Sequence, residues 1–163
     1  MAKTMILFVV FAAFLSGTFT ETASAKPVAC NFFEYKNAEK LLGHKAAGVD
    51  SHESKDDGSL RWACTFSSSG SEGRIFFVLI KEASEEAAKA EFEKVRSSNK
   101  GSAEFENWSG VADEAVAQTD GKNFQFVMLR KGTRTIRIKI NPSASVSFND
   151  VKAIAESLAA KLI

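Results

Sequence analysis

Regular alternation of apolar and polar residues predicts the strands of this chain. In LRWACTF, residues 60–66, every second side chain is apolar, which is the period of a strand with one buried face. RIFFVLIK, residues 74–81, is almost continuously apolar, which favours a central strand covered on both faces. Asp120-Gly121 and Lys131-Gly132 are short turns typical of hairpins. We expect five strands, at residues 60–66, 74–81, 115–119, 123–132 and 133–142.

Apolar positions three or four residues apart, together with end signals, predict the helices. Serine and asparagine favour a helix start, because their side chains accept a hydrogen bond from the first free N–H groups. Glycine favours a helix end, because it adopts the left-handed conformation there. We expect three helices: residues 37–43 ending at Gly43, a second from Ser84 to about Gly101, and a third starting near Ser147 or Asn149.

The order of these elements predicts an α+β fold. Residues 45–59 are polar and contain glycine, so we predict a loop there. The expected order is then α-β-β-α-β-β-β-α, with the strands in runs linked by hairpins. Hairpin runs favour an antiparallel sheet, here of about five strands, with helices packed on it. The sequence therefore indicates one α+β domain over residues 26–163.

The first 25 residues have the pattern of a signal peptide. Lys3 precedes the apolar run MILFVVFAAFL, and Ala23-Ser24-Ala25 has the small residues that a signal peptidase requires. We expect cleavage after Ala25, a periplasmic or secreted domain, and no stable membrane span after removal of the signal. An uncleaved anchor is the alternative, but the apolar run is short for a span. Lipid attachment at Cys30 is disfavoured, because Pro27 stands where an aliphatic residue is required.

Charge and cysteine content limit the chemistry further. The chain has 21 Lys and Arg against 20 Asp and Glu, so no strong field points to nucleic acid as a partner. An even number of cysteines in an exported chain favours a disulfide. With two cysteines the pairing is Cys30 to Cys64, and two buried free thiols are the alternative. A reactive redox pair is disfavoured, because Cys64 lies on the inward face of a predicted strand.

Two groups of polar residues could carry chemistry. The segment from His44 to Asp57 holds both histidines and several carboxylates, which could bind zinc or another divalent metal; a solvated loop is the simpler interpretation. Asp113 and Glu114 are adjacent carboxylates, but the turn in which they lie explains them. We find no motif of a known catalytic site and expect no resident cofactor or metal.

A basic surface is expected on the last hairpin. Its cations alternate with apolar residues, which places several of them on the outward side of neighbouring strands. Such a surface could meet an acidic protein or envelope component, whereas solvated charges that prevent edge pairing are the alternative. The candidate partner surface comprises Arg130, Lys131, Arg134, Arg137 and Lys139, with an exposed Trp108 nearby.

The order of several short motifs resembles exported bacterial domains, many of them lipoproteins of unknown function, with a PsbP-like fold. The motifs are ACNFFEYKNAEKLLG, then WACTF, then the turn from Gly110 to Ala115, with Ala112 in place of a second glycine. The resemblance spans nearly the whole mature chain and implies the same fold and a disulfide between Cys30 and Cys64. It implies no reaction, and the lipid-attachment motif is missing here.

The sequence therefore predicts an exported binding or interaction domain without a catalytic site. The alternative is a metal-dependent enzyme, or a metal-binding protein, that uses the segment from His44 to Asp57. A third hypothesis is a purely structural envelope protein.

Overall fold

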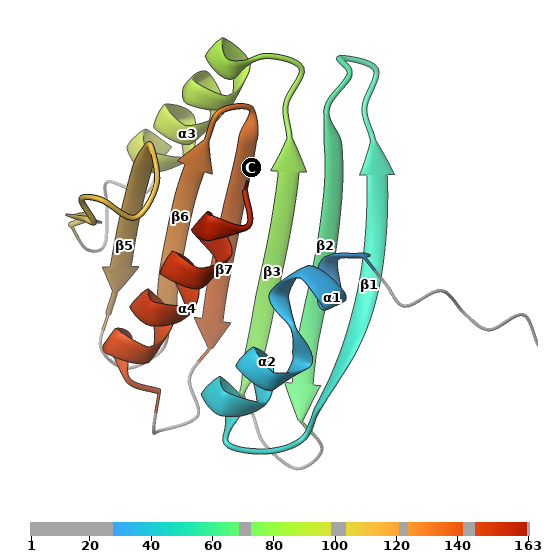
Figure 1. Cartoon of the computed structure of the whole chain (residues 1–163), viewed down its shortest axis with the longest axis vertical. Coiled ribbons are helices and arrows are strands. Elements are labelled where there is room, and N and C mark those ends of the chain that lie inside the picture. Colours follow the sequence, from blue (N-terminus) through green and yellow to red (C-terminus); the bar gives the residue numbers. More distant parts are fainter. Residues whose placement is uncertain (1–27, 69–72, 99–103, 121–123, 142–145, 163) are drawn as a thin grey trace, which may run out of the picture.

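One antiparallel sheet forms the centre of the protein, in a computed structural model that describes residues 28–68, 73–98, 104–120, 124–141 and 146–162 (Figure 1). The strand order is β1-β2-β3-β7-β6-β5-β4, and all neighbouring strands are antiparallel. The signal peptide predicted for residues 1–25 lies outside the described residues. The strands are β1 Ala46–Ser54, β2 Leu60–Ser68, β3 Arg74–Lys81, β4 Glu106–Asn107, β5 Glu114–Thr119, β6 Gln125–Lys131 and β7 Arg134–Asn141.

The helices lie on both faces of this sheet. In Figure 1, α1, α2 and α4 lie on the near face, and α3 lies behind the strands at one end. The described helices are α1 Val28–Phe33, α2 Tyr35–Leu42, α3 Glu85–Ser98 and α4 Phe148–Ala160. The predicted class, an antiparallel α+β fold, is confirmed. None of the described helices is both long and apolar enough to cross a membrane.

The predicted count and order of strands were wrong at the two sheet edges. Residues 46–54, expected in a loop, form β1, which pairs with β2 from Ala46 opposite Ser68 to Ser54 opposite Leu60. Most of its side chains are exposed, so the strand shows no apolar alternation. Backbone hydrogen bonds to β2 hold it in place. The two-residue β4 at the other edge pairs with β5 and was also missed.

The helix ends follow the predicted signals more closely. Ser147 is the N-cap of α4, and Gly43 ends α2 in the left-handed conformation, with φ of 73°. The Ser84 side chain accepts a hydrogen bond from the Ala87 N–H at the start of α3. The short helix α1 was not predicted, and Glu34 separates it from α2.

Alternation along the strands divides the core into two layers. The main layer, under α1, α2 and α4, contains Phe33, Phe77 and the three isoleucines of β7. The smaller layer under α3 contains Phe92, Val116 and Met128. Successive residues of β6 therefore serve different layers, because side chains alternate between the faces of a strand.

The two cysteines form a disulfide that ties α1 to the sheet. Cys30 of α1 and Cys64 of β2 are bonded, with a Cα–Cα distance of 5.1 Å, and both are buried. This fits the predicted pairing. Gly48 of β1 makes room for the bond, because a Cβ at that position would lie 2.8 Å from the Cys30 sulfur. The disulfide thus fixes the position of α1 on β2 and β1.

Candidate ligand-binding groove

The structure divides the predicted basic surface between the two faces of the sheet. Arg130 is only 3% exposed and lies on the α3 side. Its guanidinium donates to Glu114 at 2.5 Å and to Asp113 and Glu85, each at 3.5 Å. The adjacent carboxylates noted in the sequence are thus partners of a buried arginine. The prediction that Arg130 lies on an outward surface was wrong.

The remaining cations of the hairpin separate in the same way. Arg137 lies on the α3 side and pairs with Glu91 at 2.6 Å. Lys139 lies on that side too, with its Nζ 5.8 Å from the centre of the Phe124 ring. Lys131 and Arg134 lie on the opposite face, beside the C-terminal end of α4. A single basic surface of five cations therefore does not form.

Trp108 is buried, so its expected exposure was also wrong. It is 3% exposed and packs against Phe148, with 5.3 Å between ring centres. The indole N–H donates to Glu106 at 3.1 Å. Its apolar ring is therefore part of the core beneath α4.

The structure does not bring the two histidines together. His44 precedes β1, whereas His52 lies within it and contacts the Trp62 ring at 5.4 Å between centres. A strand rises about 3.3 Å per residue, so about 20 Å separate Ala46 from His52. Within the described residues, the one group of metal-ligand type close enough for an ion is Cys30, Asp50 and Cys64, and its two sulfurs are bonded to each other.

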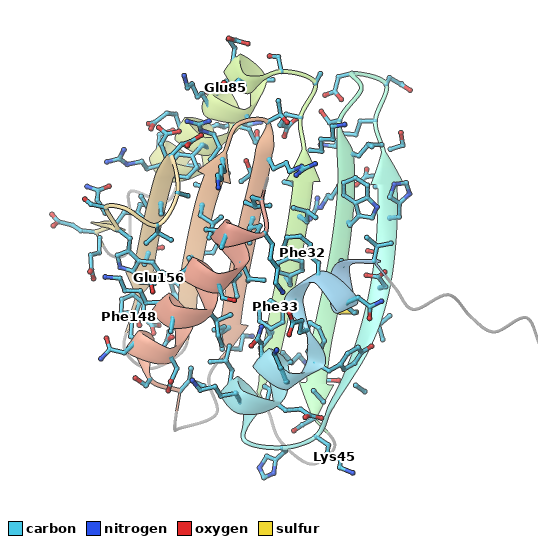
Figure 2. The ribbon with its side chains drawn as sticks, in the orientation of Figure 1. Phe32, Phe33, Lys45, Glu85, Phe148 and Glu156 are labelled. Atoms are coloured by element: carbon cyan, nitrogen blue, oxygen red, sulfur yellow. A yellow bond between two sulfur atoms is a disulfide. The ribbon has the colours of Figure 1, made fainter. Side chains whose placement is uncertain are left out.

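A groove lies between α1 and the C-terminal end of α4, above the ends of β3 and β7. Figure 1 shows α1 and α4 separated on one face of the sheet, and Figure 2 shows the labelled Phe32 between them. The groove has a volume of about 230 Å³. Its apolar lining residues are Val28, Phe32, Trp62, Leu79 and Leu162, and its cations are Lys81 and Arg134.

A second depression adjoins this groove and extends its basic end. It has a volume of about 410 Å³ and shares Arg134 and Leu162 with the groove. The β6–β7 turn supplies its other lining residues, among them Lys131. Within the described residues, neither depression is lined by a carboxylate, a histidine or a thiol.

Strand register aligns the three cations at this end. β7 lies between β3 and β6 in the sheet. Arg134 at its start is opposite Lys81 of β3 and opposite Lys131 of β6. Residues directly opposite in antiparallel strands point to the same face. We call Lys81, Arg134 and Lys131 the cation row.

Lys161 connects the two helices that border the groove. Its ammonium group donates to the Glu34 carboxylate and to the Phe32 carbonyl oxygen, the latter at 3.3 Å. It also lies 5.8 Å from the centre of the Phe32 ring. The hydrogen bonds from Lys161, and secondarily from Lys36, lower the pKa of Glu34 from 4.5 to about 2. The ion pair thus persists well into acidic solution.

Glu34→Gln is expected to remove one acid-sensitive contribution to stability. Because the folded pKa is lowered, the contribution is present above about pH 4.5 and is lost as the pH falls through about 2. Wild type should therefore have the higher melting temperature at neutral pH, and the difference should vanish near pH 2. The variant keeps the side-chain shape, so it isolates the charge. Thermal unfolding followed by circular dichroism at stepped pH measures this.

Glu156→Gln on α4 is the matched control. Glu156 is exposed and lies away from the groove in Figure 2, so its substitution removes one negative charge without touching the Glu34 site. A pH-independent difference between wild type and Glu34→Gln, or the same pH profile in Glu156→Gln, contradicts the assignment to the ion pairs of Glu34 with Lys161 and Lys36.

Comparison with known proteins supports the fold. No protein-family model and no curated protein matches this chain. Among solved structures, it is similar to the extracellular domain of PknH from Mycobacterium tuberculosis, with a TM-score of 0.58 and 11% identity. The match covers 78% of this chain and 90% of that domain. At this identity the likeness concerns the fold alone.

Sequence reasoning missed the groove as a unit. Lys131 and Arg134 were noted, but Lys81 was not, and no apolar lining residue was linked to them. These cations and apolar residues lie side by side only because β7 lies between β3 and β6 in the sheet. This pairing brings together strands that are far apart in the chain. The one local signal was a cation at the end of each of these strands.

Proposed function

We propose that this chain is an exported, non-catalytic binding domain whose ligand site is the groove between α1 and α4. The signal-like start supports export, and a buried disulfide is typical of oxidising compartments outside the cytoplasm. The fold shared with an extracellular domain agrees with this location. We also propose that the chain belongs to the PsbP-like group and that its partner is a component of the cell envelope.

The groove itself is the observation that carries the proposal. Small-molecule sites are concave and mostly apolar, with a few polar groups that orient the ligand. Here the apolar walls come from α1, β2, β3 and the end of α4, and the polar groups are cations at one end. Its described lining has no carboxylate or histidine that could act as a general base, which favours binding over catalysis.

Binding of the neutral apolar dye N-phenyl-1-naphthylamine tests the groove as a site. We expect saturable binding of one dye per chain, measured by dye fluorescence. Val28 is 59% exposed at the groove, so Val28→Asp can change the lining without disturbing the core. This variant should bind the dye about tenfold more weakly or worse, because it places a charge beside the apolar site.

Val49→Asp is the matched control. Val49 is also an exposed valine, at 74%, and lies on the edge strand β1 outside the groove. It should bind the dye as wild type does. No saturable binding to wild type, or equal loss in both variants, overturns the proposed site.

A further inference from the structure

We propose that the groove takes an anionic amphiphile: one short apolar chain with a phosphate-type or carboxylate head on the cation row. This inference rests on the proposed function and names the ligand class of the same site. The occupant is a single molecule held in the groove, as opposed to the surface of a membrane.

The cation row places three like charges side by side. Arg134 is directly opposite both Lys81 and Lys131, and Cβ atoms of such pairs are about 4.5–5.5 Å apart. Like charges in this arrangement repel each other and destabilise the sheet. A bound anion would relieve the repulsion, and an arginine beside two lysines suits a phosphate or carboxylate.

On the other face, the two arginines of the hairpin have carboxylate partners, whereas the two lysines of the cation row have none among the described residues. Arg130 has three carboxylate partners, and Arg137 has Glu91. In the described part of the chain, Lys81 and Lys131 form no ion pair. The fold therefore supplies internal counter-charges to the arginines on the α3 side and leaves Lys81 and Lys131 on the groove side available to a ligand.

The apolar wall begins one step along the same strands. Leu79 lies two residues before Lys81 on the same face, and Trp62 is directly opposite Leu79. Two residues span about 6.6 Å along a strand, so an anionic head on the cation row places the next atoms of the ligand against Trp62 and Leu79. Val28, Phe32 and Leu162 from the flanking helices complete this apolar part.

The size of the groove restricts the apolar part to a short chain. A volume of about 230 Å³ is below the 300–1,000 Å³ typical of sites for drug-sized ligands. A lipid with two long chains would leave most of its apolar surface in water. A single chain of moderate length suits the cavity.

Isothermal titration with decyl phosphate and decanol, both as monomers at neutral pH, tests the head-group requirement. We expect decyl phosphate to bind about tenfold more tightly than decanol, because only the phosphate gains charge-assisted hydrogen bonds from the cation row. Inorganic phosphate should bind much more weakly than decyl phosphate. Decyl phosphate should also change the fluorescence of Trp62, a change that Trp62→Phe removes.

Lys81→Met and Lys131→Met remove one charge each and keep an unbranched apolar stem. Each variant should bind decyl phosphate about five- to tenfold more weakly than wild type. The affinities for decanol and for the neutral dye should stay unchanged. Neither should lower the melting temperature, because the lost charge was repelled by its neighbour. Lys139→Met is the matched control, since this exposed lysine of the same hairpin lies on the other face. It should bind decyl phosphate as wild type does.

The outcomes separate the inference from the proposed function. If the neutral dye binds but decyl phosphate is no tighter than decanol, the groove remains a site and the amphiphile inference is wrong. If neither the dye nor decyl phosphate binds, both fail. If inorganic phosphate binds as tightly as decyl phosphate, the ligand needs no apolar chain and the inference is wrong. If the protein binds dioleoylphosphatidylglycerol vesicles but not monomeric decyl phosphate, it recognises a membrane surface, and the inference of a single bound molecule is wrong.

Discussion

Replacing Cys30 and Cys64 together by alanine is expected to lower the free energy of unfolding by about 2–5 kcal/mol. The bond closes a loop with a sequence separation of 34 residues, and the chain-entropy relation gives about 4 kcal/mol for a loop of this length. It also ties α1 to β2, and α1 contributes Val28 and Phe32 to the groove. Urea unfolding at neutral pH, followed by circular dichroism, measures the change in stability.

The double alanine variant should also bind the neutral dye more weakly than wild type, because α1 loses its covalent anchor. Wild type treated with a reductant is the control that keeps both sulfur atoms and breaks only the bond. It should lose a similar amount of stability. A reduced wild type as stable as the oxidised protein would show that the bond contributes little and that any loss in the alanine variant comes from packing.

Arg130→Met is expected to cost about 3 kcal/mol of stability, the low end for breaking a buried ion pair, because its carboxylate partners are partly hydrated. The variant leaves Glu85, Asp113 and Glu114 near one another without their common cation. It also removes the hydrogen bond from the guanidinium to the Gly132 carbonyl oxygen, at 3.0 Å. The midpoint of urea unfolding should fall, with the slope unchanged.

The effect of Arg130→Met should extend to the β6–β7 turn. Asp113 accepts a hydrogen bond from the Gly132 N–H at 2.8 Å, so this carboxylate joins the arginine to the turn between Lys131 and Arg134. Arg137→Met is the matched control, because it breaks a single, less buried pair with Glu91, 21% and 30% exposed, and should cost about 1 kcal/mol, the upper end for exposed pairs. Equal losses in the two variants would contradict a special role for the buried arginine.

Local signals were sufficient for most of the elements. Ser84 starts α3 with a side-chain hydrogen bond from the Ala87 N–H, and Ser147 occupies the N-cap position of α4 without such a bond; an N-cap involves only the first turn of its own helix. The β6–β7 hairpin forms where glycine provides the positive φ that its turn requires, 56° at Gly132. The apolar runs of β2 and β3 were recognised because their side chains fill the core. Each of these features depends on residues close together in the chain.

Two expectations failed because burial is a property of the whole fold. Arg130 looked like a surface cation, but α3 and the turn at Asp113 cover it and supply its counter-charges. Trp108 lies in an irregular segment without periodicity, so only the packing of α4 showed that it is buried. The edge strand β1 escaped notice for the opposite reason, since little of it is buried.

The sequence by itself determined the class of fold, the hairpins β2–β3, β5–β6 and β6–β7, the start of α3 and α4, the end of α2 and the pairing available to its two cysteines. The tertiary structure alone decided which cations meet and what lies beside them. β7 takes its place between β3 and β6, which brings Lys81, Arg134 and Lys131 into one row beside Trp62 and Leu79. Local periodicity specifies the face of a strand on which a residue lies, whereas its neighbours across the sheet depend on long-range pairing.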